Sequence, residues 1–221
     1  MNLIKHYKNT DSQWGWTIIV IHWLLVLPIV GLFALGLYMM DLGYYDSFYT
    51  LAPQIHEAVG LIVLALMVFR VIWRLTNKTP KPPKTNSSLI NTASHIAHKS
   101  LYSLLFIILF SGLLISYAGG QGINIFDWFI LPGPKEFFEN QATYAGEVHY
   151  FSAFALIGLV VLHSAAALKH HFIDKDSTLT KILGIKELGI GGLGNWGNWG
   201  IGELGKYNSL FMSMVKIIII I

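Results

Sequence analysis

The chain has no cysteine among its 221 residues, and it carries few charges. The absence of cysteine excludes disulfides, iron–sulfur clusters, thiolate zinc sites and covalent c-type haem attachment. Charged residues make up only 12% of the chain, whereas 54% are hydrophobic. This composition is typical of a membrane protein, and the length suits one domain of a few spans plus tails. We expect membrane lipid as a partner and no nucleic acid.

Long, mostly apolar runs predict four membrane-spanning helices, because about 20 apolar residues suffice to cross a bilayer. The runs extend from Ser12 to Met40, from about Pro53 to Leu75, from near Thr92 to Gly119-Gly120, and from Val148 to Leu168. The first is too long for a signal-peptide core and lacks a small-residue cleavage site, so it should remain as a span.

Polar segments separate these spans and divide the chain into three parts. We expect residues 1–12 to form a cytoplasmic head, residues 13–172 a four-span bundle, and residues 173–221 a Gly- and Ile-rich tail in the cytoplasm or at the membrane surface. The connection 119–147 has an aromatic part too short to span, which we expect to lie across the membrane surface. The predicted fold class is therefore all-α, an integral membrane four-helix bundle.

The basic residues predict the orientation of the bundle. Lys135 is the only Lys or Arg in the connections 41–51 and 119–147. The positive-inside rule therefore places these two connections outside and both termini in the cytoplasm. The basic residues assigned to the cytoplasmic side are Lys5, Lys8, Arg70, Arg74, Lys78, Lys81, Lys84, Lys99 and those from Lys169 to Lys186.

Four histidines fall into two pairs when they are placed by depth. His149 and His163 are fourteen residues apart, which is roughly 21 Å along one face of a helix. His22 lies in the inner half of the first span, at the level of His163. His56 opens the second span from outside, at the level of His149. Each pair thus joins two different helices.

Two imidazoles from different helices at one depth suit the two axial positions of a haem iron, one on each porphyrin face. Zinc would require three or four ligands at one level, where only two are present. The alternative for each residue is a buried histidine bonded to a backbone carbonyl. Because ionisable side chains inside a membrane are costly, two depth-matched pairs favour a functional role.

Other polar residues leave alternatives open. Arg70 is fourteen residues after His56, at the depth of His22 and His163. There it could bind a haem propionate, or its side chain could extend to the membrane surface. The second explanation is favoured for Arg74. His95 and His98 could contact the propionates of the inner haem or a quinone head group. Alternatively, they lie at a helix end that is exposed to water and have no such role.

Several segments resemble the bacterial cytochrome b561 family. These are IIVIHW (18–23), IHEAVGLIVLALMVFRVIWRL (55–75), HIAHKSLYSLLFIILFSGLL (95–114) and EVHYFSAFALIGLVVLHSAAALKHHF (147–172). The resemblance covers roughly residues 10–180 and implies a bacterial inner-membrane bundle that binds two haems b. The family's ligands would fall on His22, His56, His149 and His163. The glycine- and isoleucine-rich tail departs from the family, whose members usually end soon after the fourth span.

The resemblance implies transmembrane electron transfer, and three interpretations compete. The first is an oxidoreductase that passes electrons from an external donor such as superoxide to ubiquinone or a similar quinone. The second is a cytochrome b subunit that serves a partner dehydrogenase or hydrogenase. The third is a haem-free membrane protein. Compact loops favour small diffusible redox partners over a docked subunit, and the sequence leaves homo-oligomerisation open. Lys135 is a candidate for attracting an anionic donor.

Overall fold

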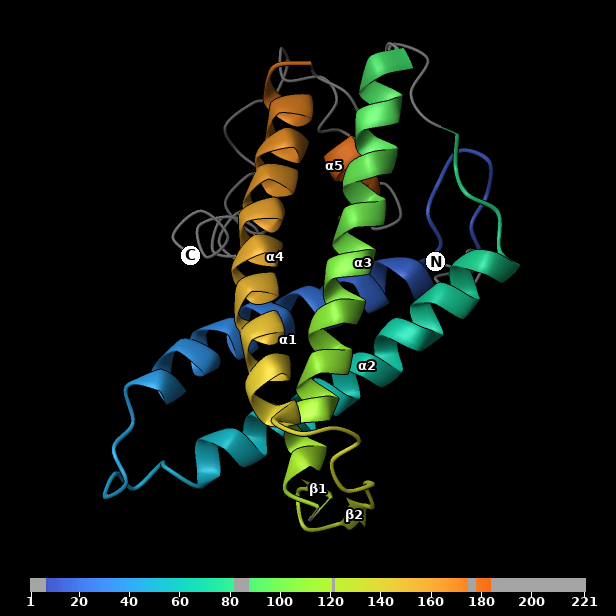
Figure 1. Ribbon diagram of the computed structural model, residues 1–221. Coiled ribbons are helices and arrows are strands. Elements are labelled where there is room, and N and C mark those ends of the chain that lie inside the picture. Colours follow the sequence, from blue (N-terminus) through green and yellow to red (C-terminus); the bar gives the residue numbers. More distant parts are fainter. Residues whose placement is uncertain (1–6, 82–87, 121, 175–177, 184–221) are drawn as a thin grey trace, which may run out of the picture. The chain divides into compact units, whose positions relative to one another are not determined.

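The computed structural model describes residues 7–81, 88–120, 122–174 and 178–183. Its elements, shown in Figure 1, are α1 (Trp16–Met40), α2 (Leu51–Thr76), α3 (Ser88–Ala118), β1 (Ile123–Ile125), β2 (Phe129–Leu131), α4 (Gln141–Phe172) and α5 (Thr178–Ile182). The four long helices are long and apolar enough to cross a membrane. This confirms the predicted helical membrane bundle. The terminal isoleucine run of the predicted tail lies outside the described residues.

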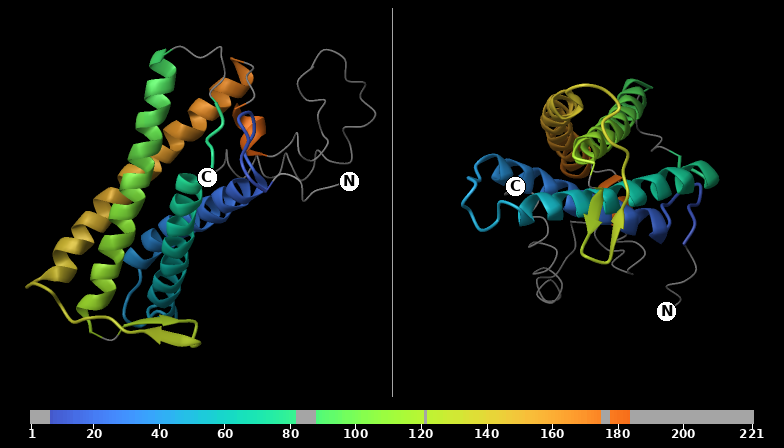
Figure 2. Two further views of the ribbon diagram at one scale, coloured as in Figure 1. Left: turned by 90° about the vertical axis from the view of Figure 1, so that its right-hand side faces the viewer. Right: turned by 60° about the horizontal axis from the view of Figure 1, so that its bottom comes forward.

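The helices form two antiparallel pairs, α1 with α2 and α3 with α4, which cross one another (Figures 1 and 2). The hydrophobic core lies where the pairs meet. It consists of Ile21 and Leu25 from α1, Val63 and Met67 from α2, Leu105 and Leu109 from α3, and Leu156 from α4. All four spans therefore contribute to one core, as a single bundle requires.

Large hydrophobic side chains cover much of the outer surface of the spans. Leu27 is 60% exposed, Phe151 is 69% exposed and Leu162 is 67% exposed. A protein surface with this many exposed apolar side chains would aggregate in water, whereas membrane hydrocarbon solvates such side chains well. The exposed faces are consistent with contact to lipid.

Two predicted boundaries were wrong. α4 begins at Gln141, seven residues before the predicted start at Val148, so His149 lies two turns inside the helix instead of opening it. α3 begins at Ser88 instead of near Thr92. Hydropathy marks only the apolar part of a helix, and both helices continue through polar residues beyond it. The predicted end at Gly119-Gly120 is confirmed, since α3 ends at Ala118.

The connection between α3 and α4 contains a β-hairpin, which the sequence did not predict. β1 and β2 pair antiparallel, with Ile123 opposite Leu131 and Ile125 opposite Phe129. Phe126 and Asp127 turn the chain with φ values of 49° and 59°. Asn124 stabilises this turn, because its side chain accepts a bond from the Asp127 N–H at 3.0 Å and donates to the carboxylate.

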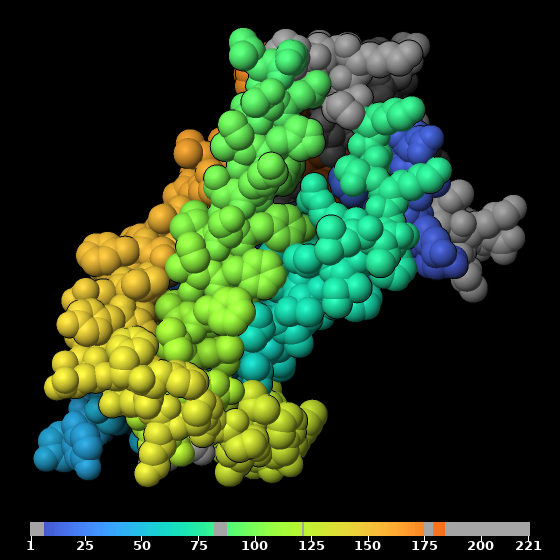
Figure 3. Space-filling model, turned by 45° about the vertical axis from the view of Figure 1, so that its right-hand side comes forward, coloured from blue at the N-terminus to red at the C-terminus, as the bar shows by residue number. Residues whose placement is uncertain are grey.

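The hairpin packs against α2 through β1, where Ile123 is only 1% exposed. Figure 3 shows the hairpin and the chain that follows it gathered at one end of the bundle. A buried glutamine fixes the other end of this connection. The Gln141 amide accepts a bond from the Phe137 N–H at 2.8 Å and donates to the Leu114 carbonyl at 2.7 Å. The start of α4 is thereby tied to α3.

Candidate functional site

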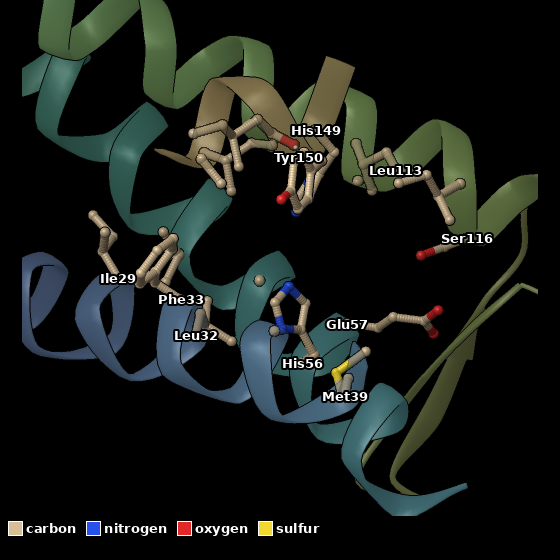
Figure 4. Close-up of a pocket in the computed structure, with 18 of the residues that line it drawn as sticks. Ile29, Leu32, Phe33, Met39, His56, Glu57, Leu113, Ser116, His149 and Tyr150 are labelled. Carbon is tan, nitrogen blue, oxygen red and sulfur yellow. Dashed lines mark hydrogen bonds between the residues drawn. The ribbon is translucent and has the colours of Figure 1, made fainter. Parts of the chain in front are cut away.

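A cavity of about 310 Å³ lies between the two helix pairs at the hairpin end of the bundle. Its wall is almost wholly apolar and takes side chains from all four long helices and from Ile123 of β1. The polar lining residues are His56, Glu57, Ser116, His149 and Tyr150. Figure 4 shows these five side chains around one space. An apolar cavity with a few convergent polar groups is the usual form of a cofactor site.

His56 and His149 face one another across this cavity (Figure 4). Their ring centroids are 6.0 Å apart and their planes are inclined by 63°. Two imidazoles on opposite sides of one metal ion place their ligating nitrogens about 4 Å apart, since each metal–nitrogen bond is about 2.0 Å. Adding the distance from each nitrogen to its ring centre gives a centroid separation of about 6 Å. The structure therefore brings these two residues together, at a spacing that suits an iron between them.

His149 is held in one orientation from α3. Its Nδ1 lies 3.0 Å from the Ile108 carbonyl oxygen and 3.3 Å from the Ser111 hydroxyl. A carbonyl can only accept, so Nδ1 carries the proton and donates to Ile108. The lone pair then resides on Nε2, the nitrogen that a metal would take, and such a second bond is usual for a ligating histidine. The buried Nδ1 of His56 has no partner among the described residues.

One glycine from each long helix lines the same cavity: Gly36, Gly60, Gly112 and Gly146. A Cβ built on Gly60 or Gly146 would meet no atom within 4 Å. A Cβ on Gly112 would lie 3.3 Å from Cε1 of His149. The missing side chains leave room beside both histidines, as a flat macrocycle between them would require. The residues present therefore fit a haem.

A second polar cluster lies at the opposite end of the bundle. His163 of α4 and His98 of α3 have ring centroids 5.3 Å apart. His22 of α1 is near enough to interact electrostatically with His163, His98 and Arg70. The structure thus brings the predicted partners His22 and His163 into one cluster, but the ring in direct contact with His163 is that of His98.

Arg70 projects into this second cluster. Its Nε donates to the Tyr102 hydroxyl at 2.8 Å, and the Arg74 guanidinium lies 5.5 Å from the centre of the same tyrosine ring. The buried Nη1 of Arg70 has no partner among the described residues. A buried donor without an acceptor is costly, and a carboxylate or another anion would satisfy it.

The remaining histidines differ in their exposure and in their polar contacts. His98 is half-buried and its Nδ1 lies 3.5 Å from the Ser94 hydroxyl, whereas His95 is exposed. His170, at the end of α4, pairs with Asp174 at 3.0 Å. In the described part of the chain no three His, Cys, Asp or Glu side chains gather as a metal site.

Sequence reasoning missed Glu57 and Ser116. The half-buried Glu57 of α2 lies in the cavity wall together with Ser116 of α3, as Figure 4 shows. The signal was present in the sequence, because Glu57 is an ionisable residue in an otherwise apolar span, directly after His56. Such residues are costly in a membrane and usually functional.

Comparison with known proteins assigns the family. The family model described as prokaryotic cytochrome b561 matches residues 13–184. The chain belongs to the prokaryotic cytochrome b561 family. It is 41% identical to "Cytochrome b561 homolog 2" of Escherichia coli over 178 residues, which are 80% of this chain and 95% of the relative. It is 28% identical to "Probable superoxide oxidase CybB" of Yersinia pestis over 80% of this chain and 97% of the relative.

A further relative is "Cytochrome b561 homolog 1" of Escherichia coli, which is 27% identical over 78% of this chain and 97% of the relative. The cytochrome b561 fold is a membrane electron-transfer bundle, so this assignment makes the chain a membrane electron-transfer protein. Membership implies binding of haem b and residence in the inner membrane. The family match ends at residue 184, so it covers the first residues of the predicted tail 173–221 and not the rest.

Proposed function

We propose that this cytochrome b561 is a di-haem protein that carries electrons across the membrane between a donor at the hairpin end and a quinone. His56 and His149 would hold one haem, and His22 and His163 the other. The observation that carries the proposal is the 6.0 Å separation of the His56 and His149 rings inside a glycine-lined cavity. The polar cluster around His163, at the other end of the same four helices, provides the place for the second haem.

The residues of the chain position, orient and shield the two sites. Haem b, when bound, supplies an iron that accepts and releases one electron at a time. The Ile108 carbonyl and the Ser111 hydroxyl orient His149, so that its Nε2 faces the cavity. Ile123 of the hairpin is buried and forms part of the cavity wall, where it would shield a bound haem from water. Burial of this kind and the hydrogen bonds to the ligands set the potential of a haem.

Arg70 would bind a propionate at the second site. Its Nη1 is buried without a partner, while Tyr102 fixes the guanidinium through Nε. A guanidinium held at one nitrogen presents its remaining N–H groups in a defined direction, which suits bidentate binding of a carboxylate. His22 and His163 lie beside this arginine.

The orientation of the bundle supports an external donor. The hairpin end has Lys135 as its one cation in the loops 41–50 and 119–140, so we propose that this end faces the cell exterior and both termini the cytoplasm. Superoxide as donor and ubiquinone as acceptor are consistent with the relative named a probable superoxide oxidase. The alternative is a cytochrome b subunit whose donor is a partner dehydrogenase or hydrogenase.

The reduced-minus-oxidised absorption spectrum of the purified protein, with haem counted per chain, tests the proposal. Two b-type haems per chain are expected. One haem would exclude one of the histidine pairs, and none would refute the function. Reduction of the haems by superoxide in the purified chain alone would separate an independent oxidoreductase from a subunit that needs a partner enzyme.

A further inference from the structure

The two proposed haem sites differ in the charge of the side chains beside them. At the hairpin end, the residues that line the cavity include one formally charged group, the carboxylate of Glu57. At the other end, Arg70 and Arg74 stand beside His98, and Arg70 also beside His22 and His163. A haem at the first site would border a negative charge, and a haem at the second site two positive charges.

Charge near a haem shifts its reduction potential in a known direction. Reduction adds an electron, so a carboxylate nearby disfavours the reduced form and lowers the potential, whereas a guanidinium raises it. The effect is larger in an apolar cavity than at a wet surface, because the low dielectric screens charges less. Glu57 is half-buried in a cavity whose other lining groups are uncharged side chains and histidines.

We infer that Glu57 makes the haem at the hairpin end the lower-potential one of the two. Together with Arg70, this residue thereby sets the direction of electron transfer from the hairpin end to the arginine end. The inference rests on the proposed function, since it requires a haem at each site. Glu57 itself lines the cavity, directly after His56 in α2, so its carboxylate is close to the proposed ligand.

The alternative for Glu57 is a purely structural role in the cavity wall. Glu57→Gln separates the two roles, since the amide keeps the size and hydrogen-bonding capacity of the side chain but removes its charge. Glu57→Asp keeps the charge. Glu147→Gln is the matched control, because Glu147 is two residues before His149 but is exposed and does not line the cavity. Water screens such a surface charge.

The test is a spectroelectrochemical titration of the haems in the purified full chain. We expect two midpoint potentials in the wild type and a positive shift of the lower one in E57Q. The lower potential should stay unchanged in E57D and in E147Q. R70Q should shift the higher potential to more negative values. Glu57→Ala provides a second neutral variant, in which the same positive shift of the lower potential is expected.

Each result distinguishes this inference from the proposed function. If the wild type contains two haems but E57Q and E57A leave the lower potential unchanged, Glu57 is structural and the inference is wrong. A shift of equal size in E147Q would also overturn it, because the effect would then be one of general surface charge. If the wild type lacks two haems, the proposed function itself fails.

Discussion

The rings of His56 and His149 stand 6.0 Å apart on α2 and α4, two helices that belong to different antiparallel pairs. The two side chains have no direct hydrogen bond among the interactions described. Helix-to-helix packing alone gives no reason to keep two imidazoles opposed in an apolar cavity. A ligand between the rings provides that reason, and the predictions below follow from it.

The first prediction concerns the ligands. Replacing His56 with alanine removes one of the two nitrogens that hold the haem at the hairpin end. Haem content should fall from about two to about one per chain, because the haem at that end loses one of its two protein ligands. A pyridine haemochrome assay measures the content. His95→Ala is the control, since this histidine is exposed, and it should retain both haems. Two haems in H56A would reject the ligand assignment.

The second prediction concerns the space at Gly60. A leucine there would extend into the cavity, where no atom lies within 4 Å of an added Cβ. The protein should fold, but haem content should fall to about one per chain because the side chain occupies the place of the macrocycle. Gly31→Leu is the matched control, since Gly31 also has open space around it but is exposed. Equal haem content in both variants would contradict the assignment of the cavity.

The third prediction concerns stability. Gln141→Leu would leave the Phe137 N–H and the Leu114 carbonyl without their partner. Each hydrogen bond of this kind contributes roughly 0.5–1.5 kcal/mol, so the thermal midpoint of the protein in detergent should fall by several degrees. Gln54→Leu changes an exposed glutamine on α2 in the same way and should have little effect. Similar midpoints in the two variants would show that Gln141 does not anchor α4.

The fourth prediction concerns the donor. Lys135 is exposed beside the hairpin, and reversing its charge would weaken attraction of an anion such as superoxide. The rate of haem reduction by superoxide should therefore fall in K135E and stay near the wild-type value in K135R. Stopped-flow spectroscopy at low ionic strength measures both rates. An unchanged rate in K135E would reject a role of Lys135 in donor capture.

The positions of the four spans could be predicted because membrane hydrocarbon imposes one rule along their whole length. Every residue facing lipid must be apolar, so hydropathy reports the spans directly. The same reasoning cannot report where α4 begins, because Gln141 to Glu147 is a polar helical extension. The N-terminal turn of that helix is fixed by tertiary bonds from Gln141, which no local pattern reveals.

The hairpin was missed because its turn uses unusual residues. Phe126 and Asp127 occupy positive φ values that Gly and Asn normally supply, so the usual signal of a tight turn is absent. Which histidines gather at the same end of the bundle was readable from topology and spacing. Which rings touch was not, since His98 reaches His163 only through the relative rotation of α3 and α4. Glu57 was visible in the sequence, but only the structure places it in the wall of the cavity that His56 and His149 share.

The division into two helix pairs bears on how the protein is made. Most helix–helix contacts lie within the pairs α1–α2 and α3–α4, each formed from consecutive segments. Each pair can therefore insert and associate while the ribosome is still synthesising the chain. The proposed ligand sets, in contrast, always join a helix of the first pair to α4. Biogenesis should then proceed in two stages, in which the two helix pairs form first and haem binding then joins them. Haem-starved cells should accordingly accumulate a protease-sensitive form of the protein.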